Sequence, residues 1–317
     1  MKKFLKVALI TLGSIVGVIA LTLATTSIVN AVASNSEASE LKTYGTLVPV
    51  DGKQMNVVIH GDDTGKETDT VVLIPGFGTA APDVDFGLLI KELEPTHRVV
   101  VVEPFGYGLS DGTDKPRTSA NIVSEIHEAL QQVKVNKFVL MGHSIAGIYG
   151  LEYVNAYPSD VTAFVGIDSS VPTQPGMDTK FPISALQTAK SLGLVRVATA
   201  LGGDAYAGTD FTEDAKTQMN ILSNRNSLSD TYADEMSRFS ENFTNAQRLS
   251  FPKDLPVLEF IVKDVTVKGW TELHEEQVAS VDHGELVILK GDHYLHHTQS
   301  KAIAQSFNDF MAGLPTS

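Results

Sequence analysis

Between Val71 and Leu289 the sequence alternates short, wholly apolar runs with segments of helical spacing. An apolar run of this kind is typical of a strand buried on both faces, as strands are in parallel sheets. Helices between such strands cover both faces of the sheet. The alternation therefore predicts an α/β fold with a mostly parallel central sheet and helices on both faces. The runs cover residues 71–74, 99–102, 138–141, 161–167, 257–262 and 286–289.

Two segments depart from this alternation. Asp51-Gly52 separates β-rich runs at 47–50 and 55–60 and predicts a hairpin, because Asp-Gly favours a tight turn. From about 172 to 254 the β-rich runs disappear and apolar residues recur at helical spacing. We predict that this insert forms a helical lid over the carboxyl ends of the strands, where open α/β sheets bind ligands. One helical series in it is Tyr232, Met236, Phe239, Phe243 and Ala246.

The N-terminal segment predicts where the protein is located. Lys2, Lys3 and Lys6 precede an uncharged apolar stretch from Val7 to about Ala33. Such a positive end stays in the cytoplasm, which puts the rest of the chain on the extracytoplasmic side of the cell membrane. The stretch can be a membrane anchor, or a signal peptide cleaved near Ala33 to release a secreted protein. It is longer than the apolar core of most signal peptides, which favours the anchor.

These boundaries divide the chain into an anchor or signal peptide at 1–33, a polar linker at 34–43 and a folded domain at 44–317. The formal net charge is -14, which argues against nucleic acid as a partner because phosphate binding requires a basic surface. The chain has no cysteine, which excludes a thiolate nucleophile and cysteine-ligated zinc.

A tight turn follows the apolar run at 138–141. This turn, Gly142-His143-Ser144-Ile145-Ala146-Gly147, leads directly into a helical segment. A serine at such a strand-to-helix turn is strained and exposed, and small residues two positions before and after it let the neighbouring backbone approach. The usual pattern is G-x-S-x-G, and Ala146 adds one methyl group to it. Ser144 is therefore the candidate nucleophile; the alternative is a serine that only caps the helix.

A nucleophilic serine needs hydrogen-bond donors for the negative charge that develops on the attacked carbonyl oxygen. The backbone amide of Ile145, at the start of the helix, is one candidate. The loop Pro75-Gly76-Phe77-Gly78 follows an apolar run and offers the second, which we assign to the amide of Phe77. Glycines in this loop could also serve only to form a turn.

His293 is the candidate general base. It follows the run at 286–289 after three residues, which predicts a loop at the same edge of the sheet as Ser144. His296 and His297 are its competitors. A metal site built from the histidines is not expected, because no H-x-x-x-H pair lies on a helix.

Two aspartates could orient the imidazole of His293. Asp168 ends the run at 161–167, and Asp264 follows the run at 257–262. Both keep the chain order serine, acid, histidine. The order alone leaves both open.

Four segments carry a resemblance to a known family: 74–78 (IPGFG), 106–111 (GYGLSD), 142–147 (GHSIAG) and 291–296 (GDHYLH). With them, the chain from about Tyr44 to Leu314 resembles the α/β-hydrolase superfamily, in its lid-bearing esterase and lipase-like branch. The family usually places its acid as G-x-x-D after the strand that here is 257–262. This chain has Val262-Lys263-Asp264, without the glycine and one residue short. Some members take the acid from the end of the preceding strand, the position of Asp168, which we favour slightly.

The resemblance implies a serine hydrolase that cleaves a carboxylic ester through an acyl-enzyme, with Ser144 attacking and His293 taking its proton. No metal or organic cofactor is implied. The apolar insert indicates an apolar acyl group in a small-molecule ester or lipid, although a stripe of methionine or aromatic residues is more often simply part of a core. An amidase, an acyltransferase, a cofactor-free haloperoxidase or a C–C bond hydrolase would look much alike on this fold. The alternative from another class is a non-catalytic, hydrolase-like binding module.

Overall fold

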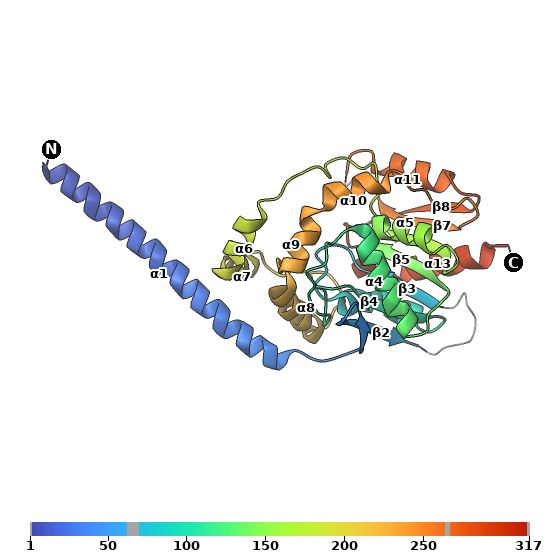
Figure 1. Ribbon diagram of the computed structural model, residues 1–317, viewed down its shortest axis with the longest axis horizontal. Coiled ribbons are helices and arrows are strands. Elements are labelled where there is room, and N and C mark those ends of the chain that lie inside the picture. Colours follow the sequence, from blue (N-terminus) through green and yellow to red (C-terminus); the bar gives the residue numbers. More distant parts are fainter. Residues whose placement is uncertain (1, 62–69, 264–266, 316–317) are drawn as a thin grey trace. The chain divides into compact units, whose positions relative to one another are not determined.

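The central sheet of the computed structural model has eight strands in the order β1-β2-β4-β3-β5-β6-β7-β8. Figure 1 shows this sheet with β2, β3, β4, β5, β7 and β8 labelled. The structure describes residues 2–61, 70–263 and 267–315. The strands are β1 (Thr46–Val50), β2 (Lys53–His60), β3 (Thr70–Ile74), β4 (Arg98–Glu103), β5 (Phe138–His143), β6 (Val161–Ile167), β7 (Val257–Val262) and β8 (Gly284–Leu289). Strands β3 to β8 are parallel, and the predicted β1–β2 hairpin joins them antiparallel beside β4. The predicted fold class is confirmed.

Helices cover both faces of this sheet. Outside the N-terminal segment and the insert, they are α2 (Pro82–Asp85), α3 (Gly87–Leu93), α4 (Ser119–Gln132), α5 (Ala146–Ala156), α11 (Trp270–Ala279), α12 (Leu295–Thr298) and α13 (Ser300–Gly313). Successive side chains of a strand point to opposite faces, so Val72 and Ile74 of β3 join one apolar cluster and Val71 and Leu73 join another. The first cluster includes side chains of α4 and α5, and the second includes side chains of α3 and α13.

The insert between β6 and β7 is helical, as predicted. Its helices are α6 (Ile183–Ser191), α7 (Leu194–Leu201), α8 (Glu213–Asn226), α9 (Asp230–Ser237) and α10 (Phe239–Ala246). The single helical series predicted from Tyr232 to Ala246 is divided between α9 and α10. The division falls at Arg238, whose backbone leaves the helical region and whose side chain binds Asp234 and Glu241.

The chain forms two compact units. The larger unit, residues 42–181 and 208–317, contains the sheet, its covering helices and α8 to α10. The smaller unit, residues 1–41 and 182–207, contains the N-terminal helix α1 (Lys2–Glu40) together with α6 and α7. The insert is thus divided between the two units.

Helix α1 is long and apolar enough to cross a membrane. It does not stop at the end of the apolar stretch but continues through most of the predicted linker, up to Glu40. The sequence from 34 to 40 contains neither glycine nor proline, the two residues that most strongly oppose helix formation. Arg196 of α7 also binds Glu37, which supports the helix beyond its apolar part.

Candidate active site

Ser144 lies at the sharp turn between β5 and α5. Its φ of 55° falls in the left-handed region, which is uncommon for a residue other than glycine and marks local strain. Backbone bonds fix the turn: the amide of Ser144 donates to the carbonyl of Ile167 (3.2 Å), and the amide of Gly147 donates to the carbonyl of Ser144 (2.9 Å). The side chain is half-buried, so a substrate can reach its hydroxyl.

His293 lies on the loop between β8 and α12 and faces Ser144. Its Nε2 is 2.9 Å from the Oγ of Ser144, and its Nδ1 is 2.6 Å from Oδ2 of Asp168. The His293 side chain is 32% exposed, whereas that of Asp168 is fully buried. The three side chains form a continuous series of hydrogen bonds from the open site into the interior.

Asp168 directly follows β6 and adopts a positive φ of 44°. Its Oδ1 accepts hydrogen bonds from the amide of Val262 (3.1 Å) and from the indole Nε1 of Trp270 (2.7 Å). With Oδ1 held in this way, Oδ2 is directed at His293 and fixes the imidazole with its Nδ1–H toward the carboxylate. Asp264, the other acid that the sequence offers, lies outside the described residues.

His143, the residue before Ser144, supports the loop that carries His293. Burial lowers the pKa of His143 well below its ordinary value, so its ring is neutral. Its Nε2 lies 3.0 Å from the carbonyl oxygen of His293, and a neutral ring donates its proton there. The rings of His143 and His293 also pack together, with centroids 4.7 Å apart. One residue of the nucleophile turn therefore helps to position the base.

The two amides expected to bind an oxyanion belong to the residue after Ser144 and to the loop after β3. Ile145 immediately precedes α5, and Phe77 lies in the loop after β3. Neither backbone amide donates a backbone hydrogen bond within the described residues. Gly76 allows the β3 loop to approach, because a Cβ there would come within 2.6 Å of the His143 ring and 2.9 Å of the Ser144 Cβ. A side chain at Gly76 would push the loop and the nucleophile apart.

Aromatic side chains from α9 and α10 border the β3 loop. The ring of Phe77 lies 4.3 Å from that of Tyr232 and 4.7 Å from that of Phe239, measured between centroids. We call these three residues the aromatic wall. Phe77 and Phe239 are only partly buried. The expected oxyanion site therefore has an apolar and partly open border.

Comparison with known proteins decides the family. Residues 69–311 match the family described as alpha/beta hydrolase fold, and this range includes all the side chains just described. The chain is an α/β hydrolase. Among curated proteins, the uncharacterized protein YbdG of Bacillus subtilis (strain 168) is 29% identical over 71% of this chain and 70% of its own length.

Solved structures share the α/β-hydrolase fold at low sequence identity. Cfl2 from Burkholderia cenocepacia has a TM-score of 0.64 at 17% identity, over 83% of this chain and 94% of its own. The enol-lactonase from Burkholderia xenovorans LB400 has a TM-score of 0.61 at 14% identity, over 84% of this chain and 100% of its own. A membrane phospholipase A, described as a bacterial virulence factor, has a TM-score of 0.58 at 18% identity over 99% of both chains. These matches show the fold alone.

A second polar cluster contains His296 and His297, which follow His293 in the chain, and Asp85. Asp85, at the end of α2, binds the Nε2 of His296 (2.7 Å) and the Nε2 of His297 (2.8 Å) through separate oxygens. The pKa of Asp85 is lowered: burial acts against this, but the two imidazoles outweigh it. A metal site built from the histidines was not expected, but the three ligand atoms lie within 4.8 Å of one another, close enough to hold a metal ion. In the structure they bind each other and tie α12 to α2.

Two residues of this region carried no signal in the sequence. Trp270 begins α11, and its contact with Asp168 depends on how α11 returns to the end of β6. Asp85 meets His296 and His297 although more than two hundred residues separate them. The competitors of His293 thus have a partner of their own. In the sequence, only the adjacent pair His296-His297 after His293 indicated a polar cluster in this region.

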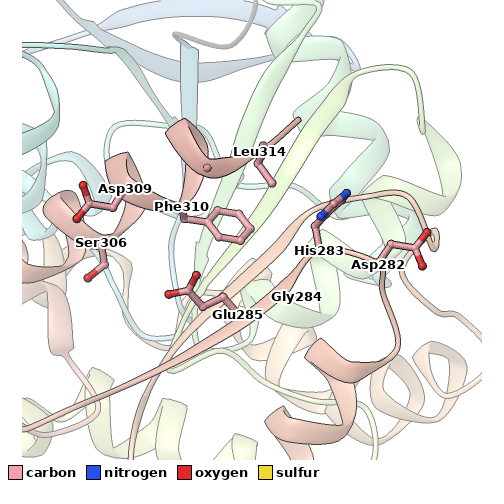
Figure 2. A pocket seen from close by; sticks show the side chains of 9 residues that line it. Asp282, His283, Gly284, Glu285, Ser306, Asp309, Phe310 and Leu314 are labelled. Atoms are coloured by element: carbon pink, nitrogen blue, oxygen red, sulfur yellow. The ribbon is translucent and has the colours of Figure 1, made fainter. Parts of the chain in front are cut away.

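A cleft of about 470 Å³ lies elsewhere on the larger unit (Figure 2). It opens beside Gly284, the first residue of β8, whereas Ser144 and Asp168 follow the last residues of their strands. The cleft is therefore at the opposite edge of the sheet from the candidate active site. Its labelled side chains include Asp282, His283, Glu285, Ser306, Asp309 and Phe310.

Proposed function

We propose that this α/β hydrolase is a membrane-anchored serine hydrolase that cleaves carboxylic esters with an apolar acyl group. The observation that carries the proposal is the hydrogen-bonded series of Ser144, His293 and Asp168, with distances of 2.9 and 2.6 Å. In this arrangement a histidine can take the proton of the serine hydroxyl while an aspartate stabilises the imidazolium that forms.

The reaction begins when the Oγ of Ser144 attacks the ester carbonyl and His293 takes the hydroxyl proton at Nε2. The amides of Phe77 and Ile145 donate to the oxyanion of the tetrahedral intermediate. His293 then protonates the leaving alkoxide, which departs as an alcohol and leaves an acyl-enzyme on Ser144. Water activated by His293 releases the acid and restores the serine.

Two further observations support ester cleavage with an apolar acyl group. The aromatic wall borders the expected oxyanion site and offers apolar contact to an acyl chain there. Two structures with the same fold carry names that denote ester hydrolysis, the enol-lactonase and the membrane phospholipase A. Epoxide hydrolases also share the fold, but a nucleophilic aspartate is expected for that chemistry, and this chain has a serine at the turn.

Contacts on both sides of Ala33 support the anchor over a cleaved signal peptide. Before it, the hydroxyls of Thr26 and Ser27 donate to carbonyl oxygens of the α6–α7 turn (2.7 and 3.2 Å). After it, Glu37 pairs with Arg196 of α7. Cleavage near Ala33 would remove the first set of contacts from the mature protein.

A fluorophosphonate probe tests the proposal on the full chain, with Ser144→Ala as the matched control. We expect covalent labelling of the wild type and none of the variant, because the probe reacts only with an activated serine. A series of p-nitrophenyl esters of increasing acyl length then measures the preference. Labelling that persists in Ser144→Ala would show that Ser144 is not the nucleophile. An unlabelled wild type would favour the non-catalytic binding module.

A further inference from the structure

Helices α6 and α7 carry apolar side chains that are not buried. All of their residues are described, and none of them is buried. On α7, Leu194, Val197 and Leu201 are 37%, 41% and 83% exposed. Their spacing of three and four residues places them on one face of the helix. An apolar face of this kind indicates an interaction with another apolar surface.

The turn between α6 and α7 packs directly on α1. Thr26 and Ser27 donate to the carbonyls of Leu192 and Ser191, at 2.7 and 3.2 Å. Gly193 has a φ of 75°, and a Cβ there would lie 2.4 Å from the carbonyl oxygen of Thr26. The close approach of the turn to α1 therefore requires glycine at this position.

The position of this contact along α1 sets its depth relative to a bilayer. A helix rises about 1.5 Å per residue, and about 20 residues cross a hydrocarbon core of about 30 Å. Counted from Val7, the core would end near Thr26. Arg196 of α7 binds Asn30, Ser34 and Glu37, which lie past that point. The turn thus meets α1 at the outer edge of the hydrocarbon, and α7 continues at the level of the lipid headgroups.

The charge of this segment differs from that of the whole chain. The chain has 38 acidic and 24 basic residues, but from Thr179 to Gly203 it has Lys180, Lys190 and Arg196 and no aspartate or glutamate. Basic residues combined with an exposed apolar face are the pattern of helices that lie in a membrane interface and attract anionic lipids.

We propose that α6 and α7 form a membrane-binding hairpin that lies in the outer leaflet beside α1. Leu194, Val197 and Leu201 face the boundary between the headgroups and the acyl chains, and Lys190 faces anionic headgroups. This proposal rests on the anchor of the proposed function, because a cleaved α1 could not hold the hairpin at the membrane. It does not depend on the identity of the substrate.

The absence of cysteine from the sequence makes the test direct. Three single-cysteine variants of the full chain carry a nitroxide spin label: Leu201→Cys on the hairpin, Val16→Cys within α1, and Glu275→Cys on the exposed side of α11. Each is reconstituted in vesicles of phosphatidylethanolamine and phosphatidylglycerol. Oxygen, which concentrates in lipid, and a water-soluble nickel chelate then report the surroundings of each label. Fluorophosphonate labelling of each variant checks that the larger unit is folded.

We expect the label at 201 to have higher oxygen and lower nickel accessibility than the label at 275, and the label at 16 to differ from the label at 275 in the same direction and by more. If 201 resembles 275 while 16 lies in lipid, the hairpin proposal fails and the anchor stands. If 16 is also in water, the anchor itself fails. Spin–spin broadening at 201 that disappears on dilution with unlabelled protein would identify a second copy of the chain as the partner and overturn the lipid assignment.

Vesicles of phosphatidylcholine alone test the contribution of charge. Without anionic headgroups, the label at 201 should become more accessible to nickel, because the attraction of Lys190 to the surface is lost. Equal accessibility in the two kinds of vesicle would remove anionic lipid from the proposal. The label at 16 is the control, since its depth depends on the apolar span and should not change.

Discussion

The two halves of the insert between β6 and β7 differ in what surrounds their apolar side chains. In α8 to α10, Met219, Leu222, Tyr232 and Phe243 are buried within the larger unit. In α6 and α7, whose residues are all described, no side chain is buried. Helices α8 to α10, which we call the inner half, belong to the hydrolase core and border the candidate active site. Helices α6 and α7, which we call the outer half, belong to the same unit as α1. One continuous insert thus has two structural roles.

This difference shows why helical spacing alone does not define a lid. Both halves repeat apolar residues at helical intervals, but the outer half pairs them with lysine and arginine and lacks acids between 179 and 203. The inner half carries buried polar anchors instead, such as Glu235, which accepts hydrogen bonds from Tyr107 and Tyr149. Charge composition thus differs between the half that packs in the larger unit and the half that we propose to lie against lipid.

The largest effect is expected at the site that the inner half borders. Asp168→Asn should lower kcat by about 10⁴, because an amide beside Nδ1 favours the wrong tautomer of His293. The side-chain oxygen of asparagine can still accept from Val262 and Trp270, so the fold should survive. Turnover of a p-nitrophenyl ester, with circular dichroism as the fold check, measures this.

Asp264→Asn is the matched control, since Asp264 is the other acid that the sequence offers. We expect it to change the rate only modestly. A large loss at Asp264 and a small one at Asp168 would reverse the assignment. Emission from Trp270, the single tryptophan, gives a second readout, because its indole donates to Asp168.

The next effect compares the stability of the two halves directly. Phe243 on α10 is 3% exposed, and Leu201 on α7 is 83% exposed. Phe243→Ala should lower the free energy of unfolding by about 3–5 kcal/mol, as the removal of a buried aromatic side chain usually does. Leu201→Ala should change it by less than about 0.5 kcal/mol. Thermal midpoints of the full chain in detergent compare the variants, and equal losses would contradict the division of the insert.

A smaller effect is expected on acyl specificity. Phe239→Ala opens the aromatic wall and should lower kcat/KM for a long-chain ester about tenfold relative to the acetate ester, since apolar contacts of this size discriminate by about 1–3 kcal/mol. Val197→Ala, on the outer half, should leave the ratio of the two soluble esters unchanged. If Val197→Ala shifts that ratio as much as Phe239→Ala does, the outer half also contributes to the acyl site.

The sequence predicted the sheet because buried parallel strands leave continuous apolar runs. It singled out Ser144 and His293 because the turn and the chain order are local features, and the structure brings both within hydrogen-bond distance of each other. Local sequence features could not decide whether Asp168 or Asp264 is the acid. The choice depends on the backbone turn after β6 and on Trp270, which reaches Asp168 from α11. The division of the insert was not predictable either, because the contact of Gly193 with α1 joins segments far apart in the chain.

The smallest effect is expected on the pH dependence of stability, which should again differ between the two halves of the insert. Burial raises the pKa of Glu235, although Arg117 and the hydroxyls of Tyr149 and Tyr107 act in the opposite direction. The folded protein therefore favours the protonated carboxyl. Its contribution to stability is complete below the pKa of an unfolded glutamate, about 4.3, and is lost as the pH rises through the folded value.

Glu235→Gln cannot ionise but keeps an oxygen that accepts from Tyr149. The difference in thermal midpoint, variant minus wild type, should therefore increase from about pH 4 toward neutrality and then level off above the folded pKa. Helices α6 and α7 contain no acid, so Lys190→Gln should show no such trend over this range. A difference that stays constant with pH would mean that Arg117 stabilises the ionised carboxylate as well as water does. The inner half would then be held by an ion pair rather than by a neutral hydrogen-bonded acid.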